Sequence, residues 1–118
     1  MTAPKQQFGQ IIPPLLTCEA VISEAAFLLK SFPRSLDALM DCLHRELIEV
    51  TFVLNEEVKA IQTLMSRYQN VPMSLADACL VRMSELHDQS ILLTLDSDFQ
   101  VYRKHGRKVI PLLIPTRY

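Results

Sequence analysis

Acidic residues lie inside otherwise apolar stretches at three places in the sequence: at Glu24, at Asp77, and at the pair Asp96 and Asp98. An ionised carboxylate without a partner costs several kcal/mol to bury, which is comparable with the net stability of a whole domain. Hard divalent cations such as Mg²⁺ and Mn²⁺ take oxygen ligands from several chain segments. The three positions together therefore predict a metal-binding acidic site.

Each of these acidic positions also has a purely structural interpretation. Asp96 or Asp98 can cap a following helix, and Asp77 can close a capping box with Ser74, three residues before it. Glu24 falls on the apolar stripe of a predicted helix, where a buried salt bridge is the alternative to metal ligation. The residues alone leave both interpretations open at every position, and only their coincidence favours the metal site.

Length and composition predict one folded domain. The chain has 118 residues, of which 49% are hydrophobic, enough for a core without disulfides. The absence of a long apolar run and of a signal-peptide pattern predicts a cytoplasmic protein. Cys18, Cys42 and Cys79 are odd in number and widely spaced in apolar surroundings, which predicts buried free thiols.

Positive charge is concentrated near the C-terminal end. The net charge is −1, but the last twenty residues carry five basic residues and no acidic one. Such a segment either pairs with phosphates or forms a solvated face that balances the acidic remainder. With only two glycines, the chain has no phosphate-cradling glycine-rich loop, and its three histidines lack metal-ligand spacing.

Hydrophobic periodicity predicts strands that alternate with helices. Helices are expected over residues 18–31, 35–44, 56–69 and 74–85, capped at Thr17, Asn55 and Ser74, with a short helix after Asp98. The third helix is expected to bury Val58, Ile61, Met65 and Tyr68. Strands are expected over residues 11–16 and 109–114, at sheet edges, and over residues 48–54 and 91–95.

This order of elements predicts an α/β layer structure with a mostly parallel sheet. In open sheets of this kind, ligands bind beyond the carboxyl ends of the strands. Asp96 directly follows the predicted strand over residues 91–95, so its position suits a functional site.

Three short segments carry a family resemblance: residues 15–25, residues 73–78, and residues 93–99 with Tyr102 and Arg103 after them. In this order and at these separations, they resemble the PIN-domain family of metal-dependent nucleases, in particular the small VapC-type ribonuclease toxins of toxin–antitoxin pairs. The resemblance covers nearly the whole chain. It implies a PIN-like three-layer α/β fold with a small, mostly parallel sheet flanked by helices.

The resemblance also implies roles for particular residues. Glu24, Asp77 and Asp96 correspond to catalytic acids that hold Mg²⁺ or Mn²⁺, with Asp98 as an outer ligand and Thr94 as a supporting hydroxyl. The metal activates a water for attack on an RNA phosphodiester. The residues expected to face the RNA backbone are Arg103, Lys104, Arg107 and Lys108. The implied partners are an RNA substrate, an antitoxin protein and a second copy in a homodimer.

The N-terminal region departs from the family pattern. Family members open with a central strand that ends in an aspartate, whereas no acidic residue precedes Glu19 here. This departure predicts an N-terminally truncated fold whose sheet lacks its central strand. Three explanations stay open: a true start further upstream, a relative that no longer cleaves RNA, or a partner chain that supplies the strand and its acid.

Two functions therefore compete. The first is a Mg²⁺- or Mn²⁺-dependent endoribonuclease, which divalent metal should stabilise. The alternative is a catalytically inactive PIN-like binding module that dimerises or pairs with an antitoxin-like protein, and whose complexes should persist in EDTA. A phospho-acceptor receiver domain fits poorly, because Glu24 and Asp77 fall on predicted helices.

Overall fold

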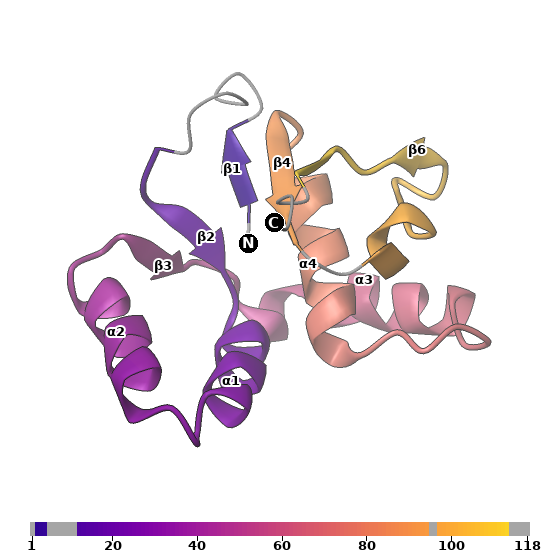
Figure 1. The fold of residues 1–118 in the computed structure, drawn as a ribbon. Helices are drawn as coiled ribbons and strands as arrows, with labels where there is room; N and C mark the ends of the chain where they lie inside the picture. Colours follow the sequence, from indigo (N-terminus) through magenta and orange to yellow (C-terminus); the bar gives the residue numbers. More distant parts are fainter. Residues whose placement is uncertain (1, 5–11, 95–96, 114–118) are drawn as a thin grey trace.

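A computed structural model describes residues 2–4, 12–94 and 97–113 of the chain (Figure 1). In this part of the chain, the main sheet has five strands in the order β3-β2-β1-β4-β7. Their bounds are β1 (Thr2–Pro4), β2 (Leu15–Thr17), β3 (Ile48–Val50), β4 (Ser90–Leu93) and β7 (Leu112–Leu113). The sheet is therefore assembled from both ends of the sequence.

The sheet is mostly parallel, as expected. Strand β2 is parallel to β3, and β4 is parallel to β7, while β1 is antiparallel to both β2 and β4. Four strands therefore share one direction and β1 opposes them. The expectation of a sheet without a central strand is wrong, because Thr2–Pro4 takes that place in the reverse direction. Without it, the facing edges of β2 and β4 would leave backbone groups unpaired.

Four α-helices accompany the sheet within the described residues: α1 (Glu19–Leu28), α2 (Pro33–His44), α3 (Leu54–Arg67) and α4 (Leu75–Leu86). Helix α4 contacts β1 and β4, α2 contacts β3, and both α1 and α3 pack against α4. Figure 1 shows α1 and α2 beside β2 and β3, with α3 and α4 on the side of β4. The α/β class expected from the alternation of elements is confirmed.

Helix α4 forms the centre of the core. Its buried residues are Ala76, Ala78, Cys79, Leu80, Val81, Met83 and Ser84. Burial on nearly all sides follows from its place between the sheet and helices α1 and α3. The side chains that flank α4 are therefore held by a tightly packed element. None of the helices in the described ranges is long and apolar enough to cross a membrane.

The N-terminal boundary of α1 differs from the expected one. Thr17 was expected as the N-cap, but it belongs to β2, and Cys18 is the N-cap without a side-chain hydrogen bond. Of the predicted edge strand over residues 11–16, Leu15 and Leu16 belong to β2, and residue 11 lies outside the described residues. The edge position is wrong, since β2 lies between β3 and β1. Pro13 and Pro14 lie just before this strand and not within it. Proline lacks an amide hydrogen and therefore cannot donate a hydrogen bond within a sheet.

The expectations for β3 and α3 are partly wrong. Strand β3 ends at Val50, and α3 begins at Leu54 with Val53, not Asn55, as its N-cap. Helix α3 buries Ile61 and Leu64, whereas Val58 and Met65 of the expected face are 49% and 38% exposed. Helix α3 contacts α4, and its buried face differs from the expected one.

The C-terminal region divides into a small hairpin and an edge strand. The predicted strand over residues 109–114 is split: β6 (Lys108–Val109) pairs with β5 (Arg103–Lys104), and β7 joins the main sheet beside β4. The edge position of β7 is confirmed. The Pro111 carbonyl, just before β7, accepts a 2.9 Å hydrogen bond from the Leu92 amide.

Candidate functional site

Asp77 is held at the N-terminus of α4 by a reciprocal pair of hydrogen bonds. The Asp77 amide donates to Ser74 Oγ at 3.0 Å, and the Ser74 amide donates to Asp77 Oδ2 at 3.1 Å. Together they form the capping box that the sequence left open as a structural role. The carboxylate is half-buried. Its position is therefore set by the helix terminus itself.

A buried tyrosine also binds the Asp77 carboxylate. The hydroxyl of Tyr102, which is fully buried, donates to Asp77 Oδ2 at 3.3 Å. The Tyr102 ring makes edge-to-face contacts with Tyr68 and Phe99, at centroid distances of 5.1 and 5.3 Å. The other carboxylate oxygen of Asp77, Oδ1, takes part neither in the bond from Tyr102 nor in the bond from the Ser74 amide. The sequence carried no signal for this contact, because 25 residues separate the two partners.

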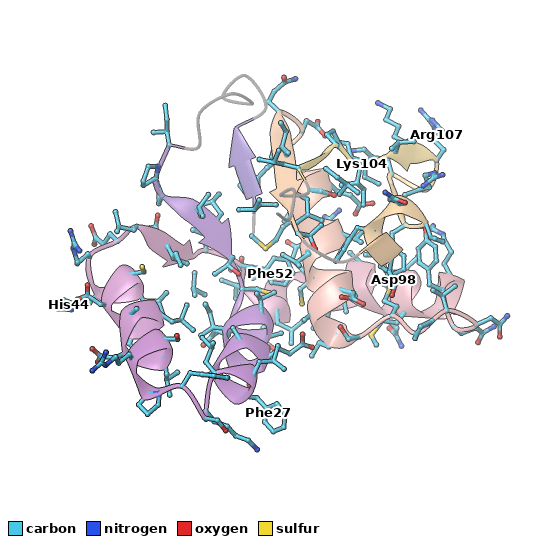
Figure 2. The ribbon with its side chains drawn as sticks, in the orientation of Figure 1. Phe27, His44, Phe52, Asp98, Lys104 and Arg107 are labelled. Carbon is cyan, nitrogen blue, oxygen red and sulfur yellow. The ribbon has the colours of Figure 1, made fainter. Side chains whose placement is uncertain are left out.

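The Tyr102 contacts connect the segment that carries Asp98 to the N-terminus of α4. Asp98 lies in the first turn of the 3₁₀ helix η2 (Ser97–Gln100), whereas the sequence predicted a helix only after it. Phe99, the next residue, is 2% exposed and packs against Tyr102. Phe99 and Tyr102 thereby connect this turn to Asp77, and Figure 2 labels the half-buried Asp98 on the turn.

The remaining candidates around this turn are Asp96 and Thr94. Asp96 lies outside the described residues. Thr94 directly follows β4, is half-buried, and donates its amide to the Leu113 carbonyl at 3.2 Å. It therefore stands where the parallel strands β4 and β7 end, the edge at which ligands bind in open sheets.

Glu24 lies on a different surface from the one expected. It is exposed, and with Ser23, Phe27 and Leu28 it lines a cavity of about 450 Å³ on α1. The expectation of a core-facing carboxylate is wrong because α1 packs on the core through its first turn, at Ala20 and Val21. Figure 2 labels Phe27 near the C-terminal end of α1, away from the first turn that contacts the core.

Two of the candidate metal ligands, Asp77 and Asp98, lie within the described residues. Their carboxylate oxygens are of the hard type that Mg²⁺ and Mn²⁺ prefer. Within the described residues, no group of three or more His, Cys, Asp or Glu side chains could hold a metal ion. A complete ligand set therefore needs a further acid, and Asp96 is the candidate between β4 and η2 in the chain.

Two of the four basic candidates are engaged within the fold. Lys104 is 6% exposed; its Nζ lies 3.8 Å from Asp88 Oδ1 and donates to the Ser84 and Asp88 carbonyls at 3.5 and 3.3 Å. These contacts give Lys104 a structural role. The guanidinium of Arg103 donates to three carbonyls, at 2.6 to 3.2 Å, belonging to Gln100, Val101 and Tyr102.

The other two basic candidates, Arg107 and Lys108, are exposed at the β5–β6 hairpin, where Figure 2 labels Arg107. The hairpin turns at His105 and Gly106, whose φ angles are 53° and 77°. The left-handed region is favourable for glycine, which lacks a Cβ. The turn therefore presents two cations to solvent.

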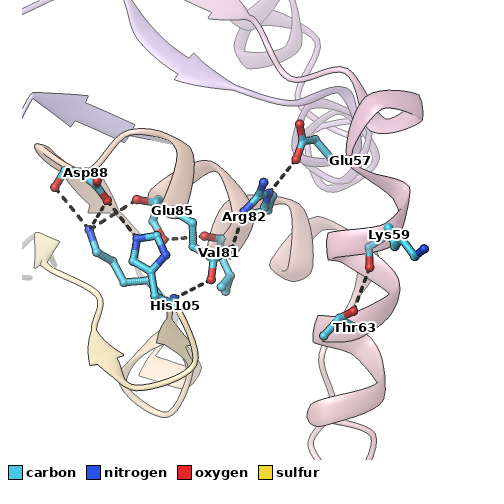
Figure 3. Close-up of polar contacts among 10 residues, drawn as sticks. Glu57, Lys59, Thr63, Val81, Arg82, Glu85, Asp88 and His105 are labelled. Carbon is cyan, nitrogen blue, oxygen red and sulfur yellow. Dashed lines mark hydrogen bonds and ion pairs between the residues drawn. The ribbon is translucent and has the colours of Figure 1, made fainter.

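Ion pairs along α4 hold this hairpin in place (Figure 3). The His105 amide donates to Glu85 at 2.6 Å, and His105 Nε2 lies 3.0 Å from Asp88 Oδ1. The hydrogen bond from His105 lowers the pKa of the Asp88 carboxyl. Arg82 Nε donates to Glu57 at 2.7 Å and NH1 to Glu85 at 3.2 Å, and the bond to Glu57 raises the pKa of Arg82. The polar cluster fixes the hairpin relative to α4 and α3.

A model of the PIN domain family matches residues 4–105 of the chain. The matched range includes the capping box at Asp77, the η2 turn and Tyr102. No curated protein and no solved structure matches the chain significantly.

Proposed function

The chain belongs to the PIN domain family, and we propose that it is a Mg²⁺- or Mn²⁺-dependent endoribonuclease of the VapC toxin type. Members of this family are generally metal-dependent nucleases. The observation that carries the proposal is the convergence of Asp77 and the Asp98 turn on the buried Tyr102. This contact joins two of the acidic segments at the ends of neighbouring core elements.

In the proposed site, Asp77 and Asp96 are catalytic acids and Asp98 is an outer metal ligand. Glu24, exposed on α1, is the third acid that the family resemblance assigns. When bound, the metal supplies an activated water and stabilises the leaving oxygen of the phosphodiester. Ser74 and Tyr102 hold one carboxylate oxygen of Asp77, which limits the directions in which the other can point. A ligand held in one geometry loses little entropy on binding.

The proposed RNA contacts are made by exposed cations of the hairpin. Arg107 and Lys108 attract the phosphate backbone without reading its sequence, so their contribution should weaken as salt is raised. Arg103 and Lys104 are proposed to hold the hairpin in position, because their charged groups are bound to carbonyls and to Asp88. The proposal places the protein in the cytoplasm with an antitoxin protein as its regulator.

Cleavage of a fluorogenic single-stranded RNA with Mn²⁺ tests the proposal. Activity is expected in the wild type and should be lost in EDTA, in Asp77→Asn and in Asp96→Asn. Asp37→Asn is the matched control, since Asp37 lies exposed on α2 and belongs to no proposed site. Cleavage that persists in EDTA or in both site variants would refute the assignment.

Thermal unfolding gives a second readout that does not depend on turnover. A ligand that binds only the folded state at a hundred times its Kd stabilises it by about 2.7 kcal/mol. Mn²⁺ should therefore raise the Tm of the wild type and of Asp37→Asn, but not of Asp77→Asn or Asp96→Asn. An equal Tm shift in all four proteins would locate the bound metal elsewhere.

The alternative is a catalytically inactive PIN-like module that binds a second copy or an antitoxin-like protein. It is favoured by the exposed apolar residues Phe27, Leu28 and Phe32, which are 64%, 71% and 60% exposed. Neighbouring apolar side chains at a surface mark interaction sites. A dimer measured by light scattering in EDTA, lost in Phe27→Ser and combined with no RNA cleavage, would support this function over the first.

A further inference from the structure

Two cysteines that the proposed nuclease chemistry does not use face each other inside the core. Cys18 is the N-cap of α1, and Cys79 lies in the second turn of α4. Each is 2% exposed, and both thiols are free. Both side chains belong to the same core cluster and line the same cavity. The two side chains are therefore neighbours in the core although they are 61 positions apart in the sequence.

The pair lies at the floor of a cavity that reaches the surface. This cavity has a volume of about 300 Å³, and both cysteines line it. Its rim includes Glu19, Ser23 and Leu75, which are exposed. A small reagent can therefore approach the thiols from solvent, even though the protein covers nearly all of their surface.

The surroundings of the pair favour ionisation of Cys18 over Cys79. The neighbouring Cys79 thiol, and after it the backbone amides of Val21 and Ala20, lower the pKa of Cys18 against the effect of burial, while Cys18 and burial raise the pKa of Cys79. Thiolate is the nucleophilic form of cysteine, and helix N-termini are a common place for it. Cys18 thus has the position of an attacking sulfur, and Cys79 that of a second sulfur within its reach.

We propose that Cys18 and Cys79 form a reversible redox site that is oxidised by small disulfides of the glutathione class. The Cys18 thiolate attacks one sulfur of the small disulfide, whose S–S bond breaks and releases one thiolate. Cys79 then attacks the Cys18 sulfur, gives its proton to solvent and releases the second thiolate. The pair loses two hydrogens, and the small disulfide is reduced to two thiols.

The new bond would join the start of α1 to the middle of α4. It would tie together the two helices that carry Glu24 and Asp77. Disulfides of cytosolic proteins are usually transient and redox-sensing, which suits a reversible bond at this position. The redox site does not depend on nuclease activity.

Oxidation of the purified full chain by oxidised glutathione tests the proposal. Intact mass should show the loss of two hydrogens with no glutathione retained, and peptide mapping should find Cys18 linked to Cys79. Dithiothreitol should reverse both changes. Cys42→Ser is the matched control and should behave as the wild type, since Cys42 lies on α2 away from the pair. Cys79→Ser should retain one glutathione, bound to Cys18.

Two results would overturn the proposal. One is a wild-type protein that stays fully reduced under conditions in which a short cysteine peptide reacts to completion. The other is modification of Cys42 without a link between Cys18 and Cys79. Both are read from the wild type, so a variant that fails to fold does not affect the decision.

Discussion

The substitution Asp77→Asn separates the structural role of this carboxylate from its proposed role as a metal ligand. Repulsion among clustered acids predicts that removing one charge stabilises the metal-free protein. The structure predicts the opposite sign. Asp77 Oδ2 accepts hydrogen bonds from the Ser74 amide at 3.1 Å and from the Tyr102 hydroxyl at 3.3 Å, at the positive end of α4.

The size of the effect follows from these contacts. An amide oxygen can accept the same two bonds, but each loses the strengthening that a charged acceptor provides, together about 1 kcal/mol. The loss of a negative charge at a helix N-terminus costs about 0.3–1 kcal/mol more. The substitution also relieves repulsion between partly exposed carboxylates. Because salt screens this repulsion, its relief offsets less than about 1 kcal/mol of the destabilisation. We therefore expect a net destabilisation of about 1–2 kcal/mol.

Urea unfolding in EDTA measures this difference. The matched control is Ser74→Ala, which removes the hydroxyl that caps the Asp77 amide but keeps the carboxylate, and should cost about 1 kcal/mol. In Mn²⁺ the two variants should diverge further, because only Asp77→Asn removes a proposed ligand. An Asp77→Asn protein as stable as the wild type in EDTA would refute the structural reasoning.

Three further predictions address the contacts around α4. Tyr102→Phe keeps the ring contacts and removes the bond to Asp77, so it should cost about 1 kcal/mol in urea unfolding, and no loss would contradict that bond. Lys104→Ala should destabilise the protein by about 2 kcal/mol, because packing and hydrogen bonds are lost. Arg107→Ala should leave the unfolding free energy unchanged and weaken RNA binding at low salt. The reverse pattern would refute the structural role of Lys104 and the RNA-binding role of Arg107. The hydrogen bond from His105 holds the pKa of Asp88 below its ordinary value of 3.8. The ionised Asp88 therefore stabilises the fold above pH 3.8, and this stabilisation is lost as the pH falls and Asp88 is protonated. In His105→Gln, the stability should depend less steeply on pH in this acidic range.

Much of the secondary structure was predictable from local sequence. Ser74 and Asp77 stand at the spacing of a capping box, and the box forms, because its bonds join residues of a single turn. The apolar run around Ile91 becomes β4, and the run with Pro111 lies at a sheet edge, since proline cannot donate within a ladder. Periodicity and turn chemistry suffice where the partners are close in sequence.

Burial depended on contacts between distant segments. Glu24 and Val58 occupy apolar stripes in the sequence yet are exposed, because only the first turn of α1 and one side of α3 meet the core. The direction of β1 was equally hidden, since a strand of three residues carries no information about its neighbours.

Some features of the candidate site could likewise be predicted from the sequence, and others depended on tertiary contacts. The sequence by itself indicated the candidate acids, the spacing of a capping box at Ser74 and Asp77, and free cysteines. Only the tertiary structure decided that Tyr102 holds Asp77, that Lys104 is buried against Asp88, and that Cys18 faces Cys79. The physical reason is that contacts between residues 16 to 61 positions apart form only after folding of the chain brings the partners together.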